Sequence, residues 1–194
     1  MDSINDADII ARSMRDPELF AGIFDRHFDS VYAYLVRRVG PDVGGDLTAD
    51  AFLAAFESRR RYDLSRPIAR PWLFGIATNL AHRHWRTERL RLESIANAAP
   101  SGTAMTEDET VDRVDAAVAA GEVSDAVASL DSGCRDVLLL IAWADLAYAE
   151  VAEALDIPIG TVRSRLSRAR QQLRRRLANS PLFPELSHLL DTGV

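Results

Sequence analysis

The residues best suited to chemistry in this sequence are arginines crowded into one short segment. Residues 161–177 read TVRSRLSRARQQLRRRL and contain seven arginines and no acidic residue. Guanidinium groups donate hydrogen bonds to phosphates and to the edges of bases, so such a segment is typical of nucleic-acid binding. The chain as a whole is acidic, with 29 Asp and Glu against 23 basic residues, so the positive charge of this segment is local.

Apolar residues in this segment recur at the spacing of an α-helix and fall on one narrow stripe. The stripe consists of Val162, Leu166, Ala169, Leu173 and Leu177, and the opposite side consists of Ser164, Ser167, Arg168, Gln171 and Arg175. The pattern predicts an amphipathic helix that buries one face and exposes a cationic one. No glutamate stands four residues before these arginines to pair with them, which favours a binding surface over an ordinary solvated face.

A second, shorter helix is predicted just upstream, in YAEVAEALDIPIG, residues 148–160. Asp156 tolerates a left-handed backbone and Pro158 discourages the helix from continuing past Ile157. Thr161 is the predicted N-cap of the cationic helix that follows. Two short helices with a tight turn and a cationic second helix form the pattern of a helix-turn-helix, whose second helix enters the major groove of DNA. A purely structural helical hairpin is the alternative.

Length and composition limit the class of protein. The 194 residues allow one or two small domains. No apolar run is long enough to span a membrane, and the acidic start MDSINDADII does not resemble a signal peptide, so a cytoplasmic protein without membrane insertion is expected. Cys134 is the single cysteine, which excludes an internal disulfide and a multi-cysteine zinc site.

No pattern in the sequence indicates catalysis. There is no pair of general acid and base, no nucleophile motif and no phosphate-binding loop, and Cys134 with a distant histidine is too weak a combination. His82 and His84 are two positions apart and do not share a helix face, so they do not indicate a metal site. We therefore expect a protein that is not an enzyme and that needs no cofactor or metal.

Charge and composition divide the chain into modules. Residues 87–130 hold three arginines and nine acids, and their centre is rich in proline, glycine and small residues, which is typical of a linker. No long segment alternates with period two, so the expected fold class is all-α, two small helical domains joined by an acidic linker. The expected boundaries are a first module at 1–90, a flexible linker at 91–122, a second module at 123–178 and a C-terminal tail at 179–194.

Three helices are expected in the first module. The first begins near Pro17 and ends at Gly40, the second covers residues 46–60, and the third begins at Arg70. Proline suits the first position of a helix, and a Gly-Pro pair ends one. A basic loop with a single aromatic residue, Tyr62, lies between the second and third helices.

Three stretches of the chain resemble a known family when they are taken in order. DLTADAFLAAF, RYDLSRPIARPWLFGIATNLAHRHWR and LDSGCRDVLLLIAWADLAYAEVAEALDIPIGTVRSRLSRAR resemble regions 2.2, 2.3–2.4 and 4 of extracytoplasmic-function (ECF) sigma factors, compact two-domain members of the sigma-70 family. The resemblance covers about residues 5–177. It implies a non-catalytic factor that binds core RNA polymerase and directs promoter-specific initiation at −10 and −35 elements. The alternative is a stand-alone helix-turn-helix regulator that binds duplex DNA without polymerase.

The resemblance also implies roles for individual residues. Asp46 and Asp50 match the acids that dock on the clamp of the largest polymerase subunit. The −10 element would be contacted by Arg61, Tyr62, Asn79, Arg83 and Arg86, and the −35 element by Thr161, Arg163, Ser164, Ser167 and Arg168. The loop at 59–68 matches one that captures a flipped base, and Tyr62 either stacks on that base or anchors the loop to the domain. Core polymerase and promoter DNA are the expected partners, and an anti-sigma factor is a further candidate.

Two residues depart from the family pattern, and two segments each have two alternative roles. The family often has Ser where Ala147 stands and Gly where Asp156 stands, so a helix cap worth about 1 kcal/mol is expected to be missing. The acidic linker would either occupy the RNA channel of polymerase or act as a plain spacer. The tail at 179–194, outside the resemblance, carries an apolar cluster that would either cap the second module or restrain the protein before core binds.

Overall fold

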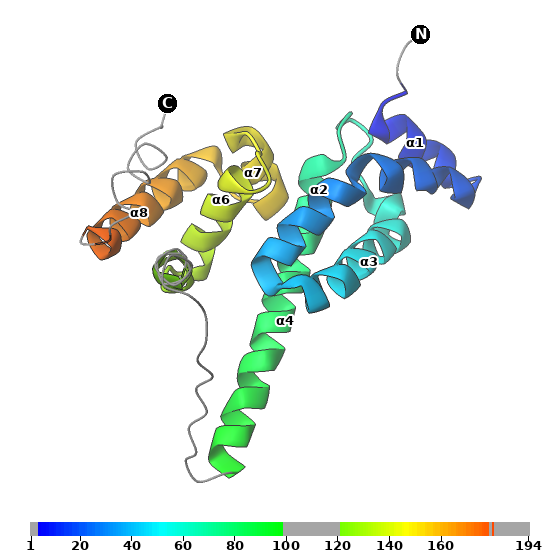
Figure 1. Cartoon of the computed structure of the whole chain (residues 1–194). Helices are drawn as coiled ribbons and strands as arrows, with labels where there is room; N and C mark the ends of the chain where they lie inside the picture. Colours follow the sequence, from blue (N-terminus) through cyan, green and yellow to red (C-terminus); the bar gives the residue numbers. More distant parts are fainter. Residues whose placement is uncertain (1–3, 99–120, 179, 181–194) are drawn as a thin grey trace, which may run out of the picture. The chain divides into compact units, whose positions relative to one another are not determined.

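The computed structural model describes residues 4–98, 121–178 and 180, and every regular element in this part of the chain is a helix (Figure 1). The expected all-α fold class is therefore confirmed. The described residues fall into two compact units, one formed by 4–98 with 140–157 and the other by 121–139 with 158–180 apart from residue 179.

The first unit is built around three packed helices, α2, α3 and α4. Its N-terminal elements are α1 (Asp6–Ser13), the 3-10 turn η1 (Pro17–Phe20), α2 (Ala21–Val39), α3 (Pro41–Ser58), the 3-10 turn η2 (Arg59–Arg61) and α4 (Arg70–Ala98). Ile23, Leu35 and Phe74 are among the largest side chains that these helices bury completely. Tyr34 is also fully buried, and its hydroxyl lies 2.9 Å from that of Thr78, which links α2 to α4.

Proline and glycine mark the start of η1 and the junction between α2 and α3. Pro17 opens η1, which leads directly into α2. Gly40, with φ +89°, separates α2 from α3, and only glycine adopts such a backbone without strain. Helix α3 begins at Pro41, five residues before the predicted start. A Cβ on Gly44 would lie 2.7 Å from the Cα of Val36, so this glycine is what allows the two helices to pack so closely.

Helix α4 is longer than the sequence predicts. Its first half is buried against α2 and α3, while its second half extends beyond them (Figure 1). Residues 91–98, which the sequence assigns to the linker, continue this helix. Residues 99–120 of the expected linker, and the tail at 179–194 apart from Ser180, lie outside the described residues.

Residues 140–157 also belong to the first unit and include α7 (Tyr148–Leu155), which contacts α4. A Cβ on Gly75 would lie 2.5 Å from the carbonyl oxygen of Ala154, so α4 meets α7 through a glycine. The Arg66 guanidinium lies 2.8 Å from the Glu153 carboxylate. The sequence places 140–157 in the second module instead, and the module boundaries stay a prediction.

The second unit contains α8 (Ile159–Leu177), the first residues of α6 (Ser132–Ala142) and a helical stretch at 121–128. All five residues of the predicted apolar stripe on α8 are buried. Three of them pack with the other segments in a small core of Ala126, Leu130, Cys134, Ala169, Leu173 and Leu177. The stripe predicted from spacing alone is therefore confirmed.

Candidate nucleic-acid and polymerase interfaces

The exposed face of α8 carries the residues that the sequence assigns to the −35 element. Arg163, Ser164, Ser167 and Arg168 are exposed, whereas Thr161 is half-buried. Val162 and Leu166 are buried beneath them, so packing of the apolar stripe fixes which way the polar residues point. The result is a row of donors and hydroxyls on a rigid helix, a form suited to the edges of bases and to phosphates.

The turn before α8 is short and carries one correction. Asp156 has φ +50°, the predicted left-handed conformation, and Pro158 is the N-cap of α8. The Thr161 amide already donates to the Pro158 carbonyl at 2.8 Å, so Thr161 lies inside the first turn. The prediction that Thr161 caps this helix is wrong, because Pro158 starts the helix earlier.

The missing cap of α7 is partly replaced. Ala147, at the N-cap of α7, offers no side-chain oxygen, as the sequence predicts. Its own amide donates to Oε2 of Glu150 at 2.8 Å. This is the half of a capping box that an alanine can still make, so one of the free amides at the helix start is satisfied.

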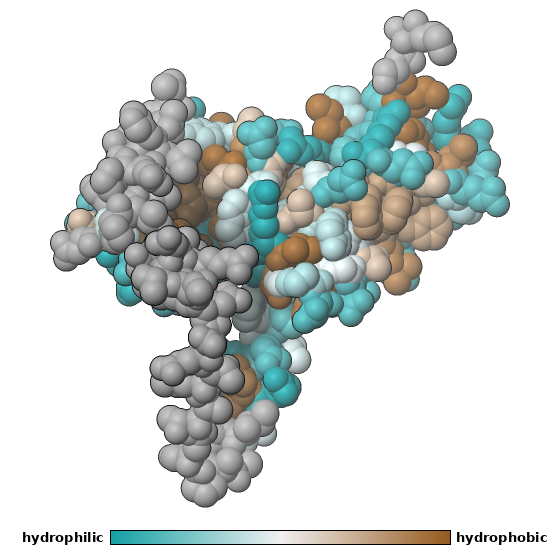
Figure 2. All heavy atoms as spheres, in the orientation of Figure 1, coloured by the Kyte–Doolittle hydropathy of each residue, from teal (hydrophilic) through white to brown (hydrophobic). Residues whose placement is uncertain are grey.

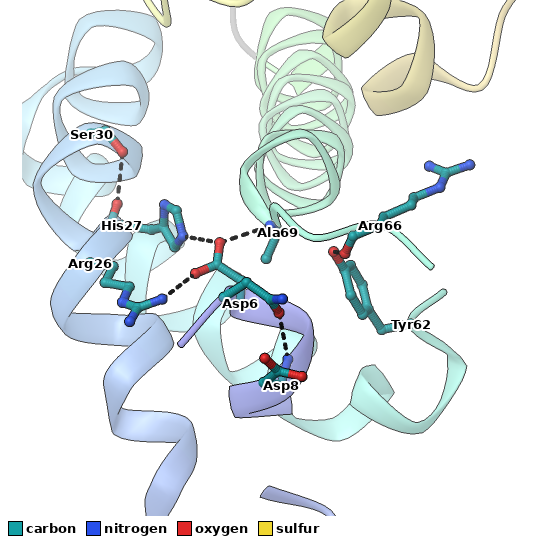
Figure 3. A network of polar contacts seen from close by, with 9 residues as sticks. Asp6, Asp8, Arg26, His27, Ser30, Tyr62, Arg66 and Ala69 are labelled. Atoms are coloured by element: carbon teal, nitrogen blue, oxygen red, sulfur yellow. Dashed lines mark hydrogen bonds and ion pairs between the residues drawn. The ribbon is translucent and has the colours of Figure 1, made fainter. Parts of the chain in front are cut away.

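The loop between η2 and α4 holds its aromatic residue inside the domain. Tyr62 is 7% exposed, its ring centroid lies 4.9 Å from that of Trp72, and its hydroxyl donates to the Arg66 carbonyl at 2.6 Å (Figure 3). Burial raises the pKa of Tyr62 to about 12, with nearby Glu153 and Asp6 adding to the effect. The geometry favours the loop anchor over the base-stacking role. Leu64 and Ile68, 46% and 53% exposed, are the apolar residues that the loop presents instead.

The other residues assigned to the −10 element lie on exposed surface. Asn79, Arg83 and Arg86 are exposed on α4, and Arg61 is exposed in η2. Trp85, 47% exposed on the same helix, is a further candidate that the sequence prediction does not include. The sequence offers one sign of this role, because Trp85 stands between Arg83 and Arg86. It also lies beyond Ala81, the last buried residue in the described part of the helix.

Asp46 and Asp50 are both exposed on α3, as their expected role requires. Leu53 and Glu57 continue the same helical face, and Leu53 is 55% exposed. Figure 2 shows apolar side chains reaching the surface among polar ones over the N-terminal helices. Phe24 on α2 is exposed as well as Leu53. The face of α3 is therefore acidic with an apolar residue in its middle.

Comparison with known proteins identifies the family. Residues 23–91 match the family model described as Sigma-70 region 2, and residues 120–173 match Sigma-70, region 4. The ECF RNA polymerase sigma factor SigW of Bacillus subtilis (strain 168) is 30% identical over 170 residues, which cover 84% of this chain and 90% of SigW. This chain belongs to the ECF sigma factors of the sigma-70 family.

Two solved structures share the fold of this sigma factor. CnrH, in complex with the cytosolic domain of CnrY, aligns with a TM-score of 0.63 at 23% identity and covers 90% of this chain and 98% of CnrH. The sigma factor RpoE of Bartonella quintana, in complex with the anti-sigma factor NepR, aligns with a TM-score of 0.59 at 20% identity over 83% of this chain and 98% of RpoE.

The matched regions include all of the predicted site residues of the sigma factor. Asp46, Asp50 and the −10 candidates fall within the region 2 match, and the −35 candidates fall within the region 4 match. Helix α1 lies before residue 23, outside both matches.

The single cysteine of the sigma factor sits in a structural position. Cys134 is fully buried in the second unit, and its amide donates to Oδ1 of Asp131 at 3.0 Å. Burial and the Asp131 carboxylate raise the pKa of the Cys134 thiol to about 11, which keeps it protonated.

Within the described ranges, no group of three His, Cys, Asp or Glu side chains could hold a metal ion, and no helix could cross a membrane.

Proposed function

We propose that this sigma factor docks on the clamp of core RNA polymerase through α3 and reads promoter DNA with α4 and α8. The −35 element would be read by the exposed residues of α8, and the −10 element by the exposed residues of α4 and the loop before it. We assign no catalytic step to this chain, because the chemistry of RNA synthesis belongs to the core enzyme. A cytoplasmic location follows from that partnership.

The observation that carries this proposal is the orientation of α8 within a region 4 match. Arg163, Ser164, Ser167 and Arg168 face outward because Val162, Leu166 and Ala169 are buried beneath them. Each arginine that reaches a guanine O6 and N7 adds about 1–3 kcal/mol of discrimination. The other exposed arginines, such as Arg175, bind phosphate and add affinity without reading sequence.

An anti-sigma factor is a further proposed partner. The RpoE structure of the same fold was determined with the anti-sigma factor NepR. Co-purification with a small protein that blocks binding to core polymerase would establish such a partner for this chain.

Run-off transcription with purified core polymerase on a library of genomic promoters tests the proposal. The sigma factor is expected to start transcription at defined sites only when core enzyme is present, and to bind the same duplexes poorly by itself. Tight, specific binding by the free protein, with no effect on initiation by core, would instead support a stand-alone regulator.

A further inference from the structure

The carboxylate of Asp6, at the start of α1, joins three parts of the first unit that are far apart in sequence. Its Oδ1 lies 2.9 Å from Nη1 of Arg26, and its Oδ2 lies 2.8 Å from Nε2 of His27, both on α2. The amide of Ala69 donates to the same Oδ2 at 2.9 Å (Figure 3). Asp6 is 6% exposed, so this is an interior contact.

A second bond from Asp6 reaches the same loop. The Asp6 amide donates to the Pro67 carbonyl at 3.0 Å. Asp6 is the first residue of α1 and Ala69 immediately precedes α4, so both amides belong to helix starts, where no partner exists within the helix. Each helix start is satisfied by the other segment, and the two bonds hold the loop on both sides of Ile68.

The loop is thus fixed at both ends and exposed between them. Tyr62 anchors the first end by its ring and its hydroxyl, and Asp6 anchors the second end. Leu64 and Ile68 stay exposed on the intervening segment. A surface held in its binding shape before the ligand arrives loses less conformational entropy when the ligand binds.

We propose that Asp6 is a positioning residue for −10 recognition, which holds the loop at 62–69 in the shape that receives a base extruded from the −10 element. This inference rests on the proposed function, since it needs the loop to contact the −10 element. Asp6 itself does not contact the DNA. It acts through the Ala69 amide and the Pro67 carbonyl.

The charge of Asp6 suits this role. Burial alone would raise the pKa of the carboxyl, but the hydrogen bonds from His27, the Ala69 amide and Arg26 outweigh burial and lower the pKa to about 2. The group is therefore a carboxylate at any physiological pH. It offers acceptors to all three donors at once, whereas an asparagine offers one oxygen and a competing NH₂ group.

The test compares holoenzymes assembled from full-length sigma factor and core polymerase. Asp6→Asn removes the charge with little change of shape, and Asp8→Asn is the matched control, because Asp8 is exposed in the first turn of the same helix. The readout is initiation from a promoter identified by run-off transcription, with each base of the −10 and −35 elements substituted in turn. Core binding and helical content are measured for each variant.

For Asp6→Asn, the preference at the captured −10 base is expected to fall about three- to tenfold, the size of effect that loss of one ordinary hydrogen bond produces. Core binding and −35 preference are expected to remain, as they do for Asp8→Asn. Hydrogen exchange in the holoenzyme is expected to speed up in the peptide covering 62–69 and to stay unchanged in α3. An unchanged −10 preference overturns the proposal, and so does an equal loss of core binding and −35 preference.

Two loop variants separate this inference from the function on which it rests. Leu64→Ala and Ile68→Ala alter the exposed part of the loop without touching Asp6. If neither changes the −10 preference, the loop does not read the −10 element, and the proposed function of the loop fails. If they change it and Asp6→Asn does not, only the positioning role of Asp6 fails.

Discussion

The hydroxyl of Tyr62 donates to the carbonyl of Arg66 at 2.6 Å and closes the loop that leads into α4. The ring centroid of Tyr62 lies 4.9 Å from that of Trp72, in the first turn of α4. The same side chain therefore holds the loop against the helix that follows it. A residue held in this way stabilises the domain, and it cannot stack on a base without leaving its site. Substitution of Tyr62 therefore tests whether this residue anchors the loop or stacks on a base.

Replacing Tyr62 by phenylalanine is expected to lower the free energy of unfolding by about 1 kcal/mol, the usual contribution of one buried hydrogen bond. Tyr62→Ala is expected to cost about 3–5 kcal/mol, because it also removes a buried aromatic ring. Denaturant unfolding measures both. A base-stacking Tyr62 would behave differently: Tyr62→Ala would leave stability unchanged and would reduce initiation from the −10 element alone.

Helix α8 shows which structural features can be predicted from the sequence and which cannot. Burial of the five residues in the apolar stripe of α8 is predicted correctly, because one helix alone determines which residues share its face. The left-handed Asp156 is predicted for the same local reason. The prediction of Thr161 as N-cap is wrong because either Pro158 or Thr161 can precede a helix. The sequence does not decide between two possible starts that lie three residues apart.

The role of Asp6 could not be predicted from the sequence. Its partners lie 20, 21 and 63 positions away, and nothing local marks an aspartate at a helix start as buried. The choice between two roles for Tyr62 also needed the structure, because a loop has no periodicity to say which way a ring points. Contacts between distant segments are the part of a site that pattern alone leaves open.

Stability in acid is expected to depend on Asp6. The pKa of its carboxyl is lowered from 3.8 to about 2 in the folded protein, so its stabilising effect is complete above about pH 4 and is lost as the pH falls toward 2. The effect amounts to about 2 kcal/mol. The difference in unfolding free energy between the parent protein and Asp6→Asn is therefore expected to shrink across this range.

Denaturant unfolding at a series of pH values measures that difference directly. Asp8→Asn serves as the control, because it removes an exposed carboxylate from the same helix turn. A difference between the parent and Asp6→Asn that stays constant from pH 5 to pH 2 would show that the Asp6 carboxylate is not held by its three donors.

Docking on polymerase is expected to depend on the acids of α3. Asp46→Arg together with Asp50→Arg reverses the charge of an exposed face, so affinity for core polymerase is expected to be lost while helical content stays the same. Fluorescence anisotropy with labelled sigma factor measures the affinity, and circular dichroism checks the fold.

Helix α2 provides a control of the same charge and spacing. Asp25 and Asp29 are exposed and one helical turn apart, so Asp25→Arg with Asp29→Arg changes net charge by the same amount at a different face. This control is expected to keep most of its affinity for core. Equal losses from both pairs would mean that net charge, rather than the α3 face, governs binding.

Arg168 and Arg175 on α8 are expected to contribute to promoter binding in different ways. Both are exposed, but Arg168 lies in the N-terminal half of the helix beside Ser164 and Ser167, where a recognition helix meets base edges. Arg168→Ala is expected to lose about 1–3 kcal/mol of discrimination at one or two −35 positions. Arg175→Ala is expected to weaken binding to all sequences alike and to lower the salt slope by about 1. Holoenzyme binding to −35 variants over a range of salt concentrations separates the two effects, and equal, sequence-independent losses would mean that another face of α8 reads the DNA.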